Sequence, residues 1–135
     1  MSDDRGSASL ELVLVTPVVL LLLLLVVCAG RLAEARADVD RAARDAARAA
    51  SIERDPSSAE DAGTSAASAT LESGGISCRS LDVSVDVSRF TAGGTVATTV
   101  SCTIDLADLA ELRVPGARTL TATFVEPIDA FRGGS

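Results

Sequence analysis

The chain has 135 residues and a formal net charge of −7, and it contains no histidine, tryptophan or tyrosine. This length allows one small domain beside any membrane anchor. Nucleic acids are bound through a basic face and through aromatic stacking, whereas this chain is acidic and has three phenylalanines as its only aromatic residues. Composition therefore argues against nucleic acid as a partner.

An uncharged segment near the N-terminus is the most informative part of the sequence. It runs from Leu12 to Gly30 and includes an unbroken run of leucines over 20–25. A helix rises about 1.5 Å per residue, so the segment over 12–30 is long enough to cross the hydrocarbon core of a bilayer as a helix. Glu11 stands at its front edge, where an ionised carboxylate is costly and needs a partner. The sequence predicts a transmembrane and assembly helix over 7–32, with Glu11 as a functional candidate.

Three simpler explanations of this segment are weaker. A secretory signal peptide cut after Ala29 would have a basic front and a shorter apolar core than this one. A lipoprotein site at Cys28 needs a small residue before the cysteine, where Val27 stands. An uncleaved single-pass anchor is consistent with the segment, but it does not explain a glycine followed by a glutamate five positions later.

The spacing of Gly6, Glu11 and Pro17 resembles the class III signal of type IV prepilins. More narrowly, it resembles the TadE-like pseudopilins of the tight adherence (Flp-type) pilus system. The alanine- and arginine-rich stretch over 42–51 is also similar to that family. Major Flp pilins place a tyrosine after the glutamate, where this chain has Leu12, which favours a minor pseudopilin. Pro17 predicts a kink in the helix.

The resemblance implies that residues 1–6 are a prepilin leader, which a prepilin peptidase removes by cutting between Gly6 and Ser7. It implies a non-enzymatic function in assembling a pilus or a related secretion filament. The implied partners are other pilin-like subunits, the pilus assembly machinery and membrane lipid. The alternative function is that of a single-pass, membrane-anchored extracytoplasmic binding module.

Glu11 has a specific function under the first of these hypotheses. Cleavage after Gly6 would create a cationic α-amino group on Ser7, since the reference pKa of such a group is about 7.7–8.0. The amine of one subunit and the Glu11 carboxylate of a neighbour would then neutralise each other and fix the axial register. The alternative is a glutamate that reaches the lipid headgroups from the end of the helix.

The distribution of arginines disagrees with the orientation that the resemblance implies. Arg5 precedes the apolar segment, and four arginines follow it closely: Arg31, Arg36, Arg41 and Arg44. The positive-inside rule alone would place the C-terminal part in the cytoplasm. The resemblance implies a single-pass protein of the cell membrane with an extracytoplasmic domain, and an extracellular filament as a further destination. We follow the resemblance.

A helical pattern continues past the membrane segment over 33–55. One face recurs at spacings of three and four, and it consists of Leu32, Ala35, Val39, Ala42, Ala46 and Ala49. This face is expected to pack on its own domain, on other subunits, or on both. The pairs Asp40–Arg44 and Arg41–Asp45 are expected on the other face. Asp55-Pro56 ends the helix, because proline disfavours the helical conformation in the residue before it.

A second helix and loop are predicted over 56–75. Ser57 and Glu60 have the spacing of a capping box, and Gly74-Gly75 provide the stop. The expected buried residues of this helix are Ala59, Ala62, Ala66, Ala69 and either Thr70 or Leu71.

Residues 76–126 alternate with period two, which predicts a small antiparallel sheet of three strands. The expected inward residues are Leu81, Val83, Val85 and Val87 in the first strand, Val96, Thr98, Val100, Cys102 and Ile104 in the second, and Leu120, Ala122 and Phe124 in the third. Gly93-Gly94 supply the first turn, and 105–112 a short connection. Residues 127–135 are expected to be a flexible tail. The predicted fold class is therefore α+β, with helices followed by a sheet.

Cys78 and Cys102 lie in the part expected outside the cell, where disulfides persist, so a bridge is predicted, with two free thiols as the alternative. Cys28 is expected to be an inert thiol in the apolar segment.

Two cysteines without histidine do not form a closed zinc site, so neither a metal nor another cofactor is expected. Serine or cysteine nucleophiles lack their usual histidine base, and Asp105, Asp108 and Glu111 fit a solvated helix face.

Overall fold

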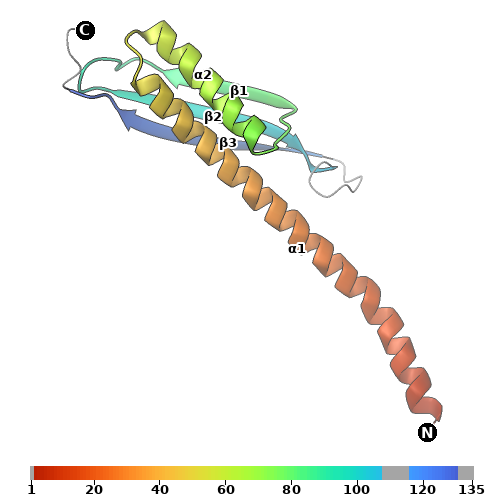
Figure 1. Cartoon of the computed structure of the whole chain (residues 1–135). Coiled ribbons are helices and arrows are strands. Elements are labelled where there is room, and N and C mark those ends of the chain that lie inside the picture. Colours follow the sequence, from red (N-terminus) through yellow and green to blue (C-terminus); the bar gives the residue numbers. More distant parts are fainter. Residues whose placement is uncertain (1, 108–115, 131–135) are drawn as a thin grey trace.

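The protein consists of one long helix, a second helix and a three-stranded antiparallel sheet, so the predicted α+β class is confirmed. The computed structural model describes residues 2–107 and 116–130. The elements are α1 (Ser2–Ser51), α2 (Pro56–Ser73), β1 (Ser80–Asp86), β2 (Thr95–Asp105) and β3 (Ala117–Pro127). Figure 1 shows that the N-terminal part of α1 projects away from the domain that its C-terminal part helps to form.

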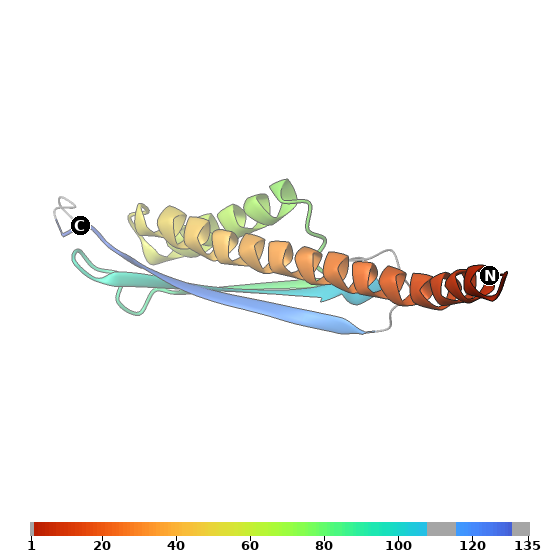
Figure 2. The ribbon, with the colours of Figure 1, turned by 90° about the horizontal axis from the view of Figure 1, so that it is seen from below.

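The domain has two layers, with both helices on one face of the sheet (Figure 2). The strand order is β1-β2-β3, so β2 lies in the centre and pairs antiparallel with both neighbours. Helix α1 packs over β2 and β3, and α2 packs over β1 and against α1. Within the described part of the chain, no element covers the opposite face of the sheet.

A wide alanine face on α1 forms the centre of the core. Along the predicted stripe, Leu32 and Ala49 are half-buried and the residues between them are buried. Burial extends to a second row of alanines, which consists of Ala43, Ala47 and Ala50. The buried face is wider than predicted because α1 is covered on two sides, by α2 and by the sheet. The stripe therefore packs within its own domain.

Helix α2 begins differently from the prediction. Its N-cap is Asp55, whose carboxylate accepts hydrogen bonds from the Ser58 backbone N–H at 2.9 Å and from the Ser57 hydroxyl at 2.6 Å. The capping box at Ser57 is wrong because Pro56 occupies the first helical position, where its fixed φ and missing N–H fit. These hydrogen bonds lower the pKa of Asp55 from 3.8 to about 2, with the Ser57 hydroxyl as the largest cause.

The buried face of α2 is also rotated from the predicted one. Ala62 and Ala66 are only half-buried and Ala69 is exposed. The buried residues recur every four positions, and they are Ala59, Gly63, Ala67 and Leu71. Gly63 decides this rotation, since a Cβ atom there would lie 2.8 Å from Val85 Cγ2 and 3.5 Å from the Ala46 carbonyl oxygen. Its missing side chain lets α2 approach both α1 and the sheet. At the other end, α2 stops as predicted, with Gly74 as C-cap and Gly75 at φ +75°.

The sheet follows the predicted alternation closely. All five predicted inward residues of β2 are buried, and β3 buries Leu120 and Ala122 and half-buries Phe124. In β1, Leu81 lies opposite Cys102 but is exposed, so its expected inward position is wrong.

The ordered chain extends further at its C-terminal end than predicted. Residues 127–130 are not part of a flexible tail, because β3 includes Pro127 and Ile128 is buried. The Ile128 backbone N–H donates to the Gly94 carbonyl at 2.9 Å, and its side chain packs with Val96 and Ala50. The remaining tail, 131–135, lies outside the described residues.

The charged side chains of α1 find other partners than those predicted. Arg41 pairs with Asp38 at 3.9 Å, and the Asp45 carboxylate accepts a hydrogen bond from the Thr70 hydroxyl of α2 at 2.7 Å. The guanidinium of Arg44 lies over the Phe124 ring, 5.8 Å from its centroid. The predicted pairs Asp40–Arg44 and Arg41–Asp45 are therefore wrong: tertiary contacts with α2 and β3 draw Asp45 and Arg44 away.

We expect Gly63→Ala to destabilise the domain, although alanine favours helix by about 1 kcal/mol over glycine. The new Cβ meets the stiff Val85 side chain, and overpacking of this kind costs about 1–3 kcal/mol. Thermal unfolding of the full chain in detergent, followed by circular dichroism, measures the difference. In a Val85→Ala background the contact is gone, so Gly63→Ala should stabilise instead. An equal effect of Gly63→Ala in both backgrounds would contradict this packing argument.

Candidate functional site

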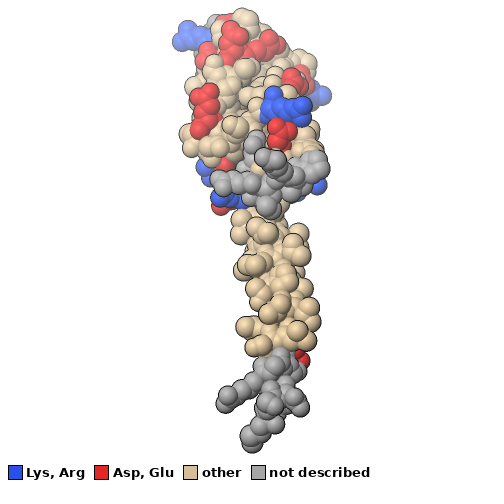
Figure 3. Space-filling view, turned by 90° about the vertical axis from the view of Figure 1, so that its right-hand side faces the viewer, with Lys and Arg blue, Asp and Glu red and all other residues tan. Residues whose placement is uncertain are grey.

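The N-terminal part of α1 presents an apolar surface that nothing in the described chain covers. Large apolar side chains are exposed along the helix from Leu10 to Val27, and no residue in the most apolar stretch of the helix is buried. The segment is long and apolar enough to cross a membrane. In Figure 3 it is the uncharged stem that leads to the charged domain. Such a surface is stable in hydrocarbon and unfavourable in water, so α1 is suited to act as a membrane anchor.

The residues of the predicted prepilin signal all lie on this helix. Gly6 and Ser7 have helical backbone, Glu11 is exposed, and α1 continues through Pro17 without interruption. Ser7 and Glu11 are four residues apart on a helix, so they share one face and are separated by one turn. The described part of the predicted leader, residues 2–6, therefore forms the start of α1. The kink at Pro17 stays a prediction.

A hydroxyl in the apolar segment was missed by the sequence analysis. The Thr16 hydroxyl donates to the Leu12 carbonyl at 2.6 Å, one turn earlier on α1. Proline at 17 cannot donate to the carbonyl of Val13, so this turn of the helix is short of one backbone hydrogen bond. A threonine beside a proline in an apolar run could have indicated this contact, because threonine commonly bonds the carbonyl four residues before it.

Cys78 and Cys102 form a disulfide with a Cα–Cα distance of 5.4 Å. Cys102 is fully buried in the centre of β2, and Cys78 lies in the connection between α2 and β1. Arg79 strengthens the same connection, since its backbone N–H donates to the Thr103 carbonyl and its side chain pairs with Asp105 at 3.4 Å. The bridge thus attaches the loop that follows α2 to the central strand, at the end of the domain from which α1 leaves.

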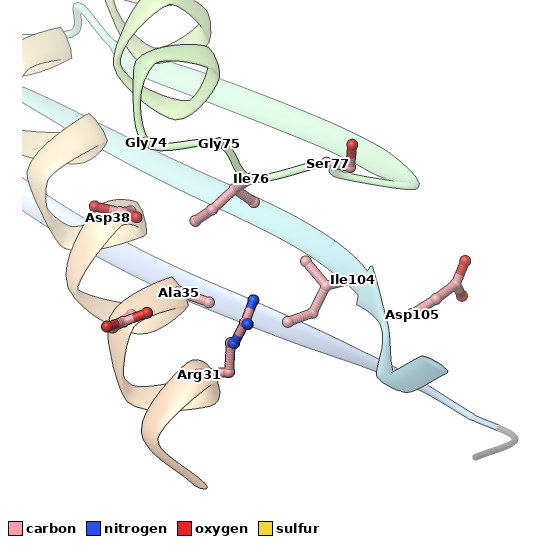
Figure 4. Close-up of a pocket in the computed structure, with 10 residues that line it drawn as sticks. Arg31, Ala35, Asp38, Gly74, Gly75, Ile76, Ser77, Ile104 and Asp105 are labelled. Atoms are coloured by element: carbon pink, nitrogen blue, oxygen red, sulfur yellow. The ribbon is translucent and has the colours of Figure 1, made fainter. Parts of the chain in front are cut away.

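Two grooves flank α1 where it enters the domain. The first, of about 360 Å³, lies between α1, β2 and the loop after α2. Figure 4 shows Arg31, Ala35 and Asp38 on α1 facing Ile76 and Ile104. Its charged lining residues are one arginine and three carboxylates: Arg31, Glu34, Asp38 and Asp105. The groove is therefore acidic.

The second groove, of about 450 Å³, lies on the other side of α1, against the first residues of β3. Its floor near the apolar segment is made by Ala29, Leu32 and Ala33, and its charged residues are Arg36, Asp40 and Arg118. Among the residues that the structure describes, neither Arg36 nor Arg118 forms an ion pair. No local pattern predicts this groove, because Arg118 is brought beside α1 only by the pairing of β3 with β2.

The described residues show no cluster of side chains for metal binding. No group of three or more acidic or cysteine side chains could hold a metal ion in this part of the chain. Asp105, one of three acidic residues singled out from the sequence, is engaged by Arg79. The other two, Asp108 and Glu111, lie outside the described residues.

Comparison with known proteins finds a family match for the N-terminal third of the chain. Residues 6–48 match the family model described as TadE-like protein. The match begins at Gly6, includes Glu11 and Pro17 and extends over most of the alanine-rich part of α1, so the resemblance to TadE-like proteins is confirmed. No curated protein and no solved structure matches the chain significantly.

We expect reduction of the Cys78–Cys102 bond to destabilise the domain strongly. The bridge closes a loop with a sequence separation of 24, which corresponds to about 3.5 kcal/mol in the chain-entropy model. Thermal unfolding of the full chain with and without reductant measures the loss, and peptide mapping without reductant identifies the bridge. Cys28→Ser is the matched control and should leave both results unchanged. Free reaction of both Cys78 and Cys102 with an alkylating agent in the folded, exported protein would contradict the prediction.

Proposed function

We propose that this protein is a minor pseudopilin of a tight adherence (Flp-type) pilus or of a related secretion filament. The observation that carries the proposal is the family match over residues 6–48, on a helix whose first part is apolar and uncovered. In this proposal α1 anchors the protein in the cell membrane as a single span, and the sheet domain is extracytoplasmic. Prepilin peptidase, other pilin-like subunits and the assembly machinery are the partners.

The geometry supports a structural function. Helix α1 continues without interruption from the apolar segment into the domain core, so a force or displacement on one part is transmitted to the other. An anchored binding module would need no such coupling, and a flexible linker would serve it better. The alanine stripe is buried inside the domain, which leaves the apolar part of α1 as the surface for contact between subunits.

Processing is the first test of the proposal. A prepilin peptidase is expected to cut between Gly6 and Ser7, because glycine leaves no side chain to obstruct the enzyme and the apolar segment holds the bond at the membrane surface. Mass spectrometry of the protein purified from its host should find a chain that starts at Ser7. Gly6→Leu should block the cut, whereas Gly30→Leu, at the other end of the apolar segment, should not. A mature chain that starts at residue 1 or 2, or after Ala29, would refute the processing step.

Glu11 is proposed to act in assembly through its charge. Cleavage would place the new α-amino group of Ser7 one helical turn from the Glu11 carboxylate, on the same face of α1. In hydrocarbon each charge alone is costly, and a pair recovers much of that cost. A neighbouring subunit displaced along the filament axis can match the two charges at only one offset, which sets the register.

We expect Glu11→Ala to leave cleavage and membrane insertion largely intact but to abolish co-purification with other pilin-like subunits. Glu11→Gln should fail in the same way, since it keeps the shape of the side chain and removes its charge. Co-purification from the host membrane, followed by mass spectrometry, measures both. Glu34→Gln is the matched control, because it removes one carboxylate from the same helix outside the apolar segment. If Glu11→Ala co-purifies like the parent, Glu11 is only an interfacial residue.

A further inference from the structure

We propose that the groove between α1 and the start of β3 binds the headgroup of an anionic phospholipid. The groove is lined by Ala29, Leu32, Ala33, Arg36, Ala37, Asp40 and Arg118. The proposal rests on α1 crossing a membrane. It does not depend on cleavage at Gly6 or on assembly of a filament, so it can fail or succeed independently of the proposed function.

The position of the groove along α1 matches the layers of a bilayer. The uncharged segment ends at Gly30, and Arg36 lies about 9 Å further along the helix axis at 1.5 Å per residue. Each headgroup layer is roughly 5–8 Å thick beyond the hydrocarbon core. Ala29, Leu32 and Ala33 therefore lie at the level of the upper acyl chain and glycerol. The Cα atom of Arg36 lies just beyond the headgroup layer, and its side chain leans toward the helix N-terminus and so reaches back into that layer.

The charge of the groove selects an anion. Arg36 and Arg118 approach from two different elements, and among the described residues Asp40 is the one carboxylate that lines the groove with them. Guanidinium groups bind phosphate oxygens through paired N–H donors, which gives geometry as well as charge. The acidic groove on the other side of α1 repels the same ligand, since Glu34, Asp38 and Asp105 outnumber Arg31 there. In Figure 3, basic side chains gather where the uncharged stem meets the domain.

A bound phospholipid gives one of the arginines that follow the apolar segment, Arg36, a function that does not depend on the orientation of the chain. Arginines that follow the apolar segment would draw this end of α1 toward the cytoplasm if they acted only as free charges. An arginine pair that grips a lipid phosphate anchors the domain against the membrane surface in either orientation. Free phosphate offers the same oxygens but no acyl chain for the apolar floor, so we assign the groove to lipid.

The test is lipid retention by the full chain in nanodiscs of equal parts phosphatidylglycerol and phosphatidylcholine, measured by native mass spectrometry. The lipids that stay bound should be enriched in phosphatidylglycerol. Each arginine near an anionic surface changes affinity about fivefold, so the double variant Arg36→Gln, Arg118→Gln should lose the enrichment. Arg36→Lys with Arg118→Lys should retain part of it. The matched control is Arg54→Gln with Arg89→Gln, two exposed arginines at the far end of the domain, which should behave like the parent.

Four results would overturn the proposal. Retained lipid with the composition of the bilayer would show that the groove selects nothing. An equal loss of phosphatidylglycerol enrichment in the two double variants, Arg36→Gln with Arg118→Gln and Arg54→Gln with Arg89→Gln, would show an effect of net charge alone. Displacement of the lipid by inorganic phosphate would assign the site to the free anion. A dimer that disappears in the Arg36→Gln, Arg118→Gln variant, without lipid enrichment, would assign the groove to a second copy of the chain. Circular dichroism of each variant, compared with the parent, confirms that the fold is retained.

Discussion

The close packing of the alanine face of α1 is the contact on which the rest of the domain depends. Ala42, Ala46 and Ala47 are fully buried, and their small side chains let α2 and the sheet approach the helix from two sides. Interaxial distances depend on the side chains at the contact, so larger residues here would push both neighbours outward. Gly63 on α2 continues the same principle, because its missing side chain makes room for Val85. Such a core is stabilised more by many close atomic contacts than by the burial of large apolar side chains.

This packing makes the anchor and the domain one mechanical unit. The helix that is suited to cross the membrane is the same helix that supplies the centre of the core, with no linker between them. The disulfide and the Arg79–Asp105 pair then hold the loop after α2 against β2, at the end where α1 leaves the domain. If α1 crosses the membrane as proposed, the domain is held at a fixed distance from the bilayer, with Arg36 and Arg118 near the headgroups. This rigidity suits a subunit whose position along an axis matters.

The uncovered parts of the molecule indicate where partners can bind. The apolar stem is exposed along its length, and the face of the sheet away from the helices carries paired hydroxyls: Thr99–Thr123, Ser101–Thr121 and Thr103–Thr119 at 3.0, 3.1 and 2.9 Å. The two hydroxyls of each pair hydrogen-bond to each other across β2 and β3. This polar face of the sheet can therefore be exposed to water without a free-energy cost. The exposed side chains of the stem are apolar and form no such hydrogen bonds, so the stem requires lipid or other apolar helices around it.

The sequence by itself determined whatever depends on local pattern. The apolar run and the 3.6-residue period predicted α1, the period of two predicted the inward residues of β2 and β3, and the spacing of Gly6 and Glu11 identified the family that residues 6–48 match. The disulfide followed from the expected compartment. Apart from the disulfide, which joins cysteines with a sequence separation of 24, these features are encoded within short windows, so distant residues could not change them.

The tertiary structure decided whatever depends on contacts between distant segments. Which face of α2 is buried was settled by Gly63 meeting Val85 and Ala46, and the extent of β3 by Ile128 packing beside Val96. The partners of Arg44 and Asp45 came from β3 and α2, and local helix spacing predicted neither of them. The groove that contains Arg36 and Arg118 exists only because antiparallel pairing returns β3 to α1. Many tertiary arrangements are compatible with the same helical and strand periodicities in the sequence, and close packing selects one of them.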